Sequence, residues 1–147
     1  MIERALKTGG VPIASMLKRG EVKILVVEDD KFLREILVGK LEKEGYTVFE
    51  ASNCNVAQKH IQGDRPHVIL LDIVLPGIDG FEVLSTLKRN RETSAIPIII
   101  ISNLGSREDV DRALRLGAKS FMIKAHHTPQ EIVDAVKKTL EEYYLRR

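Results

Sequence analysis

The feature that most constrains the fold is a regular alternation of short apolar runs with segments of helical periodicity, which starts at Val22. The apolar runs cover residues 22–27, 46–51, 67–71, 96–101 and 119–123. Runs of this length with little polar interruption are typical of strands that are buried on both faces. Five such strands, each followed by a helix, predict a parallel sheet with helices on both faces. The sequence therefore predicts an α/β fold with five strands and five helices.

Between the runs, apolar residues recur at the three- and four-residue spacing of a single helical face. The first helix is predicted from Leu33, Ile36, Leu37 and Leu41. The other four are predicted from the sets Val56, Ala57, Ile61; Phe81, Leu84, Leu87; Val110, Ala113, Leu114; and Ile132, Val133, Val136, Leu140. Each set forms a stripe that can cover one side of a sheet.

Capping and turn residues mark the ends of these helices. Asn53 and Ser106 are predicted N-caps, and residues 128–131 (Thr-Pro-Gln-Glu) form a capping box with proline at the first helical position. Gly45 and Gly117 are predicted to end the first and fourth helices. Gly63-Asp64 is predicted to end the second, and the pairs Pro76-Gly77 and Asp79-Gly80 predict a loop.

Length and composition indicate one soluble domain. The 147 residues fit a domain of ordinary size, and the net charge of +2 is too small to indicate a nucleic-acid partner. The single cysteine, Cys54, excludes an internal disulfide and suits a reducing cytoplasm. It has no activating base beside it in the sequence, so it is predicted to be inert. No apolar stretch is long enough to span a membrane.

The first 20 residues differ from the rest of the chain. They have no steady apolar period and no long apolar core of the signal-peptide type. We expect residues 1–20 to be a flexible N-terminal extension and residues 21–147 to form the domain. Met16, just before the first strand, is an alternative translation start. No further domain is expected after the fifth helix.

Polar side chains follow four of the predicted strands where each strand ends. In parallel α/β sheets, ligands bind at the carboxyl ends of the strands. Because these ends meet at one edge, we expect the polar side chains to lie close together. The first strand leads into Glu28, Asp29 and Asp30, and the others end on Asp72, Ser102 and Lys124.

These residue types suggest phosphoryl chemistry on a carboxylate. Crowded carboxylates resist joint ionisation unless a cation lies among them. Oxygen ligands without histidine or cysteine favour Mg²⁺, which also recruits phosphate oxygens. Lys124 and Ser102 supply a positive charge and a hydrogen-bond donor for an anionic group beside the metal. A carboxylate can act as the nucleophile and form an acyl-phosphate. Asp30 is predicted to be an N-cap and not a ligand.

The chain resembles the response-regulator receiver domains of two-component signalling, including the chemotaxis-regulator type. The resemblance covers about residues 21–144 and is specific because four motifs occur in the right order on the right strands. It implies the flavodoxin-like, doubly wound strand order 2-1-3-4-5. The motifs are residues 26–29 (Val-Val-Glu-Asp), residues 70–80 (Leu-Leu-Asp-Ile-Val-Leu-Pro-Gly-Ile-Asp-Gly), Ile101-Ser102, and residues 121–124 (Phe-Met-Ile-Lys).

The resemblance also implies roles for single residues. Asp72 would accept a phosphoryl group from a phosphohistidine of a sensor histidine kinase or a phosphorelay protein. The Mg²⁺ ligands would be Glu28, Asp29, Asp72 and the backbone carbonyl of Val74. Ser102 would turn toward the phosphoryl group, Lys124 would pair with it, and Phe121 would be the aromatic switch. The family is not enzymatic beyond its own phosphorylation and dephosphorylation.

The resemblance further implies a stand-alone cytoplasmic regulator that signals to a downstream protein through the face of its fourth helix, fifth strand and fifth helix. Residues flanking the acceptor influence how fast a receiver loses its phosphoryl group. Here Val74 and Leu104 are apolar and cannot position a water, which predicts slow self-dephosphorylation.

One residue departs from the family pattern. Ala125 follows Lys124, where the family usually has proline, often after a cis peptide. A cis bond before a non-proline residue costs about 3–4 kcal/mol, so we expect a trans bond, or a strained cis bond held by its surroundings. Because of this departure, the alternative hypothesis stays open that the chain is a degenerate receiver, which acts only as a phosphorylation-independent interaction module. A flavodoxin-like flavin binder is disfavoured, because its phosphate-binding loop would have to be the acidic segment Glu28-Asp29-Asp30.

Overall fold

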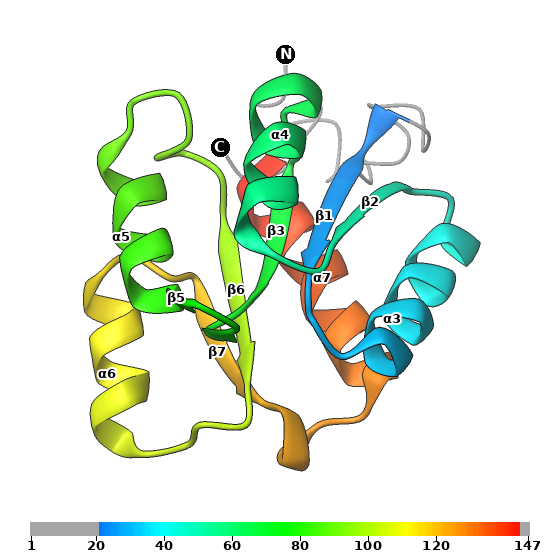
Figure 1. The fold of residues 1–147 in the computed structure, drawn as a ribbon. Coiled ribbons are helices and arrows are strands. Elements are labelled where there is room, and N and C mark those ends of the chain that lie inside the picture. The colour runs from blue at the N-terminus through cyan, green and yellow to red at the C-terminus, as the bar shows by residue number, and fades with distance from the viewer. Residues whose placement is uncertain (1–20, 145–147) are drawn as a thin grey trace.

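The computed structural model describes residues 21–144, so the predicted flexible extension and Met16 lie outside the described residues. The main sheet has five parallel strands in the order β2-β1-β3-β6-β7 (Figure 1). In sequence order this is the predicted 2-1-3-4-5. The strands are β1 (Lys23–Val27), β2 (Thr47–Ala51), β3 (Val68–Asp72), β6 (Ile98–Ser102) and β7 (Ser120–Ile123).

Five α-helices cover the two faces of this sheet, as predicted. Figure 1 shows α4 (Cys54–Asp64), α5 (Gly80–Arg89) and α6 (Arg107–Arg115) on one side. The helices α3 (Lys31–Lys43) and α7 (Pro129–Tyr144) lie on the other. Alternate residues of the strands point to opposite faces of the sheet. In β1, Leu25 and Val27 pack against the α4 and α5 side, whereas Ile24 and Val26 pack against the α3 and α7 side. The sheet is therefore the centre of two hydrophobic cores.

The predicted caps are present in the structure. Asp30 Oδ1 accepts a hydrogen bond from the amide of Leu33, and Asn53 and Ser106 cap their helices in the same way. The capping box is reciprocal: the Glu131 amide donates to Thr128 Oγ1 at 3.1 Å, and the Thr128 amide donates to Glu131 Oε1 at 2.8 Å. These bonds satisfy amides that would otherwise lack a partner at the start of a helix.

The predicted loop after β3 is partly wrong, because it contains a small antiparallel hairpin. Strand β4 (Val74–Leu75) pairs with β5 (Ile78–Asp79), with Leu75 opposite Ile78. Pro76 and Gly77 form the two-residue turn, and Gly77 has φ +75°. Proline followed by a glycine at this φ is the pattern of a type II turn. The turn residues were predicted, but the pairing needs the flanking strands to face each other.

The second helix ends at Asp64, as predicted from the pair Gly63-Asp64, and Arg65 follows it in the left-handed conformation with φ 51°. Two smaller predictions need correction. The fourth strand starts after Pro97 because proline cannot donate to the sheet. Leu114 was predicted on the buried stripe of its helix but is 44% exposed. The short helix α6 buries only Ala113 among its residues.

The predicted helix ends at Gly45 and Gly117 agree with the structure. Gly45 and Gly117 follow their helices with φ 96° and 111°. Cys54 is buried and unpaired, and burial raises the pKa of its thiol, which is consistent with an inert cysteine. None of the helices within residues 21–144 combines the length and the apolar character that crossing a membrane requires.

Candidate phosphoryl-accepting site

The polar groups at the strand ends converge as predicted, at the lower edge of the sheet in Figure 1. Glu28 directly follows β1, Asp72 ends β3, Ser102 ends β6 and Lys124 directly follows β7. Glu28 and Ser102 are fully buried and Asp72 is 3% exposed. Parallel pairing of β1, β3, β6 and β7 brings these residues together, because it aligns the carboxyl ends of all four strands.

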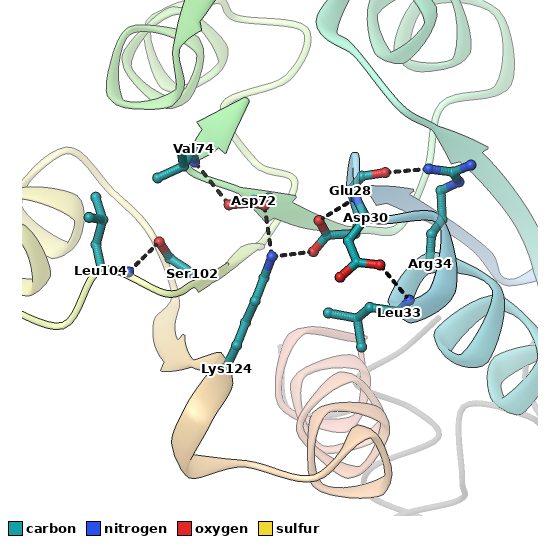
Figure 2. Close-up of polar contacts among 9 residues, drawn as sticks. All are labelled: Glu28, Asp30, Leu33, Arg34, Asp72, Val74, Ser102, Leu104 and Lys124. Atoms are coloured by element: carbon teal, nitrogen blue, oxygen red, sulfur yellow. Dashed lines mark hydrogen bonds and ion pairs between the residues drawn. The ribbon is translucent and has the colours of Figure 1, made fainter. Parts of the chain in front are cut away.

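Lys124 bridges the two buried carboxylates (Figure 2). Its ammonium nitrogen lies 2.7 Å from Glu28 Oε1 and 2.8 Å from Asp72 Oδ2. The other oxygen of Asp72 accepts a hydrogen bond of 2.9 Å from the amide of Val74. Both oxygens of Asp72 are therefore oriented, one by a cation and one by a backbone donor.

Burial and the ion pairs shift the pKa values of both Glu28 and Lys124. Burial raises the pKa of Glu28 to about 7, although hydrogen bonds from Lys124 and from the Asp30 amide act in the opposite direction. Burial by itself would lower the pKa of Lys124, but its hydrogen bonds to Asp72 and Glu28 outweigh this effect and raise it. For Glu28, burial therefore outweighs the contact with Lys124, and the neighbouring Asp72 carboxylate adds a smaller effect in the same direction as burial.

A divalent cation fits this arrangement. Glu28, Asp29 and Asp72 each offer a carboxylate oxygen, and these atoms lie within 4.8 Å of one another. Two of the three side chains are buried, while Asp29 is exposed at the mouth of the site. A set of hard oxygen donors without a histidine or cysteine suits Mg²⁺ or Mn²⁺. The raised pKa of Glu28 agrees, because a cation would favour the ionised form of this carboxylate.

The other predicted residues lie around this centre. The Ser102 hydroxyl accepts a hydrogen bond of 3.0 Å from the amide of Leu104, which leaves its proton for donation. Phe121, in β7, is half-buried and packs against the core on the α4 and α5 side. For Val74, the structure shows a contact of the amide with Asp72, whereas the predicted role concerns its carbonyl.

The Lys124–Ala125 peptide is trans, because the described residues contain no cis bond. This confirms the expected isomer. Residues Lys124–His126 form a short 3₁₀ helix that was not predicted from the sequence. The lysine nevertheless reaches both carboxylates, so the alanine does not displace it from the site.

Arg34 contacts this site, although no sequence motif marks it. Its guanidinium donates to the backbone carbonyl of Glu28 at 2.7 Å, and its side chain is only 14% exposed. In the sequence it looks like an ordinary polar residue of the first helix. The one available signal is its position one turn after the capping residue Asp30, which places it close to the end of β1.

Residues 24–137 match the family model of the response regulator receiver domain. This span is more than half of the chain and contains every strand end described above. The chain belongs to the response regulator receiver family. The receiver identity agrees with the strand order and with the carboxylate cluster.

Solved receiver structures support the same assignment. A CheY-like response regulator receiver domain protein from Methanospirillum hungatei JF-1 is 27% identical, with a TM-score of 0.76, 83% of this chain covered and 95% of that chain. The receiver domain of a signal transduction histidine kinase from Syntrophus aciditrophicus is 30% identical, with a TM-score of 0.73 and coverages of 82% and 91%. The Mn²⁺-bound form of response regulator Rcp1 is 25% identical, with a TM-score of 0.68 and coverages of 84% and 94%.

Proposed function

We propose that this receiver accepts a phosphoryl group on Asp72 from a phosphohistidine of a sensor kinase or phosphotransfer protein, with Mg²⁺ as cofactor. The observation that carries the proposal is the buried Asp72 carboxylate, which is held by Lys124 on one oxygen and by the Val74 amide on the other. A carboxylate with only a structural role would not need two further acids and a serine hydroxyl at the same edge of the sheet.

In the proposed reaction a carboxylate oxygen of Asp72 attacks the phosphorus atom. The new O–P bond forms while the N–P bond to the donor histidine breaks, and the histidine nitrogen keeps the electron pair of that bond. The product is an acyl-phosphate. Orientation of the nucleophile before attack lowers the barrier, and the Val74 amide supplies part of that orientation.

The surrounding groups would stabilise the added negative charge. Mg²⁺, held by Glu28, Asp29 and Asp72, would neutralise oxygens of the transferring group. Lys124 already lies 2.8 Å from Asp72 and can pair with the phosphoryl group. The Ser102 hydroxyl can donate its proton to the same group. Phosphorylation would thereby pull on Ser102 and on the neighbouring strand β7, which carries Phe121.

The proposed output is contact with a protein partner through the α6, β7 and α7 face. A charge added at Asp72 would bias a two-state arrangement of the loop after Ser102 and of β7, without a new fold. The guanidinium carbon of Arg112, in α6, lies 4.2 Å from the centre of the Phe81 ring. This contact links the position of α6 to the core beside the site. The proposed setting is a stand-alone cytoplasmic regulator.

Loading of the full chain with a small acyl-phosphate donor in Mg²⁺ tests the proposal. We expect a mass increase of one phosphoryl group that hydroxylamine removes, because acyl-phosphates react with this nucleophile. Beryllium fluoride with Mg²⁺ should shift the amide resonances of Ser102 and Phe121. If neither reagent changes the mass or the spectrum, the proposal fails and a phosphorylation-independent interaction module takes its place.

Slow loss of the phosphoryl group is a further expected result. Val74 is 52% exposed and Leu104 is 37% exposed, so both apolar side chains are available to flank the site. Neither can hydrogen-bond an attacking water. Replacing Leu104 with asparagine should therefore shorten the lifetime of the acyl-phosphate, measured as the decay of the loaded mass after the donor is removed. A wild-type lifetime of seconds would contradict the prediction.

A further inference from the structure

Arg34 makes two directional contacts from the second turn of α3. Its Nη1 donates to the Glu28 carbonyl at 2.7 Å, and its Nε donates to Glu50 Oε1 at 3.0 Å (Figure 2 shows the first contact). Glu50 belongs to the edge strand β2 and its side chain is 49% exposed. The guanidinium therefore joins three elements: the helix that carries it, the end of β1 and the edge of the sheet.

The carbonyl that Arg34 holds belongs to the peptide bond between Glu28 and Asp29. This peptide connects the first two of the three acidic residues that precede α3. The flanking groups are also fixed: the Glu28 amide donates to the Ala51 carbonyl, and the Asp30 amide donates to Glu28 Oε2. Arg34 thus holds the carbonyl of the 28–29 peptide, and the amides of the peptides on both sides are held as well, which restricts the direction in which Asp29 leaves the backbone.

The charge of Arg34 is already paired. Glu50 neutralises the guanidinium, so the Arg34–Glu50 pair adds little net charge at the acidic cluster. A neutral pair can orient a backbone group without repelling an incoming cation. Lysine would keep the charge but would lack the planar fork that lets one side chain serve two acceptors in different directions.

We infer that Arg34, held in place by Glu50, is a positioning residue that presents the Glu28-Asp29 pair to the divalent cation. This inference rests on the proposed function only in its choice of Mg²⁺ as the ligand. Outer groups that orient metal ligands typically change metal affinity about 10- to 100-fold when they are lost. Arg34 contacts neither the metal nor the phosphoryl group in this scheme.

A positioning role and an electrostatic role predict opposite changes in Mg²⁺ affinity for Arg34→Gln. If Arg34 acted only through its charge, Arg34→Gln would remove a positive charge and tighten Mg²⁺ binding, and Arg34→Lys would change nothing. If Arg34 positions the peptide, both variants should weaken Mg²⁺ binding about tenfold. Glu50→Gln should cause a smaller loss, because it frees the guanidinium without removing its bond to the Glu28 carbonyl.

The experiment is an Mg²⁺ titration of each variant of the full chain, followed by the amide resonances of residues 28–30 and 72–74. Arg89→Gln is the matched control: Arg89 is exposed in the last turn of α5, and its loss changes net charge equally. Thermal unfolding without Mg²⁺ identifies any variant that fails to fold. If Arg34→Gln does not fold, Arg34→Lys decides because it keeps the positive charge, and a wild-type Mg²⁺ affinity in Arg34→Lys overturns the inference.

The phosphorylation rate at varied Mg²⁺ separates this inference from the proposed function. We expect the Arg34 variants to need more Mg²⁺ for half-maximal loading and to approach the wild-type rate at saturation. Unchanged or tighter Mg²⁺ binding in both Arg34 variants, with normal loading of the wild type, refutes the positioning role and leaves the proposed function intact. If the wild type takes up no phosphoryl group, the proposed function fails, while weaker Mg²⁺ binding in the variants still supports the positioning role.

Discussion

Asp72→Asn is expected to abolish uptake of a phosphoryl group, so that the variant shows no mass increase with an acyl-phosphate donor in Mg²⁺. The amide of asparagine is a far weaker nucleophile than a carboxylate, although it has nearly the same shape. Its oxygen can still accept the hydrogen bond from the Val74 amide, and Lys124 can still pair with Glu28. The fold should therefore survive, which far-UV circular dichroism can check.

Asp79→Asn is the matched control for this experiment. Asp79 ends the small β4-β5 hairpin that follows Asp72, and its Oδ1 caps α5 by accepting from the Phe81 amide at 2.9 Å. Asparagine caps helices about as well as aspartate, so the variant should fold and should load like the wild type. Loading of Asp72→Asn would show that Asp72 is not the acceptor. Equal loss of loading in both variants would show that the loss in Asp72→Asn is not specific to the acceptor carboxylate.

Gly80→Ala is expected to destabilise the chain by about 3 kcal/mol or more, at the upper end for overpacking of a tight contact. Gly80 is buried at the start of α5, and its amide donates to the Ile73 carbonyl at 3.1 Å. An added Cβ would lie 2.6 Å from both the carbonyl carbon and the Cα of Ile73. Backbone atoms cannot move aside as a flexible side chain can. The residue displaced would be the neighbour of Asp72.

Urea unfolding of three glycine variants separates this clash from other effects. Gly39→Ala lies inside α3 with open space around the new methyl group, so it should stabilise the chain by about 0.5–1 kcal/mol. Gly77→Ala also meets no atom, but its φ of +75° should cost about 1 kcal/mol. A Gly80→Ala variant as stable as Gly77→Ala would disprove the close contact with Ile73.

Much of this fold follows from local patterns. The apolar runs predict all five strands because strands of a buried parallel sheet must be apolar on both faces. The caps Asn53, Ser106 and Asp30 are predicted because a side-chain oxygen next to a helix start satisfies nearby amides, which depends only on residues close in sequence. Leu114 shows the limit of such patterns: a helical stripe gives a direction, but the depth of burial depends on what lies opposite.

The candidate site, too, is predicted only in part from the sequence. Its membership follows from the sequence, because each of four strands ends on a polar group and parallel strands share one edge. The contacts between members do not. That Lys124 bridges Glu28 and Asp72 depends on the distances between strands that are far apart in the chain. The hydrogen bond from the Val74 amide to the second oxygen of Asp72 spans only two residues, but it depends on the backbone conformation just after β3.

The sequence by itself therefore determined the fold class, the strand order implied by the family resemblance, and the residues at the acidic edge. Only the tertiary structure decided that Lys124 reaches its partners through a trans peptide, that Gly80 packs against a backbone carbonyl, and that Arg34 ties the end of β1 to Glu50 of β2. The physical reason is the separation along the chain of the residues that interact. Periodicity and capping act between close neighbours in the chain, whereas these three features need groups from separate elements to meet within a few ångströms.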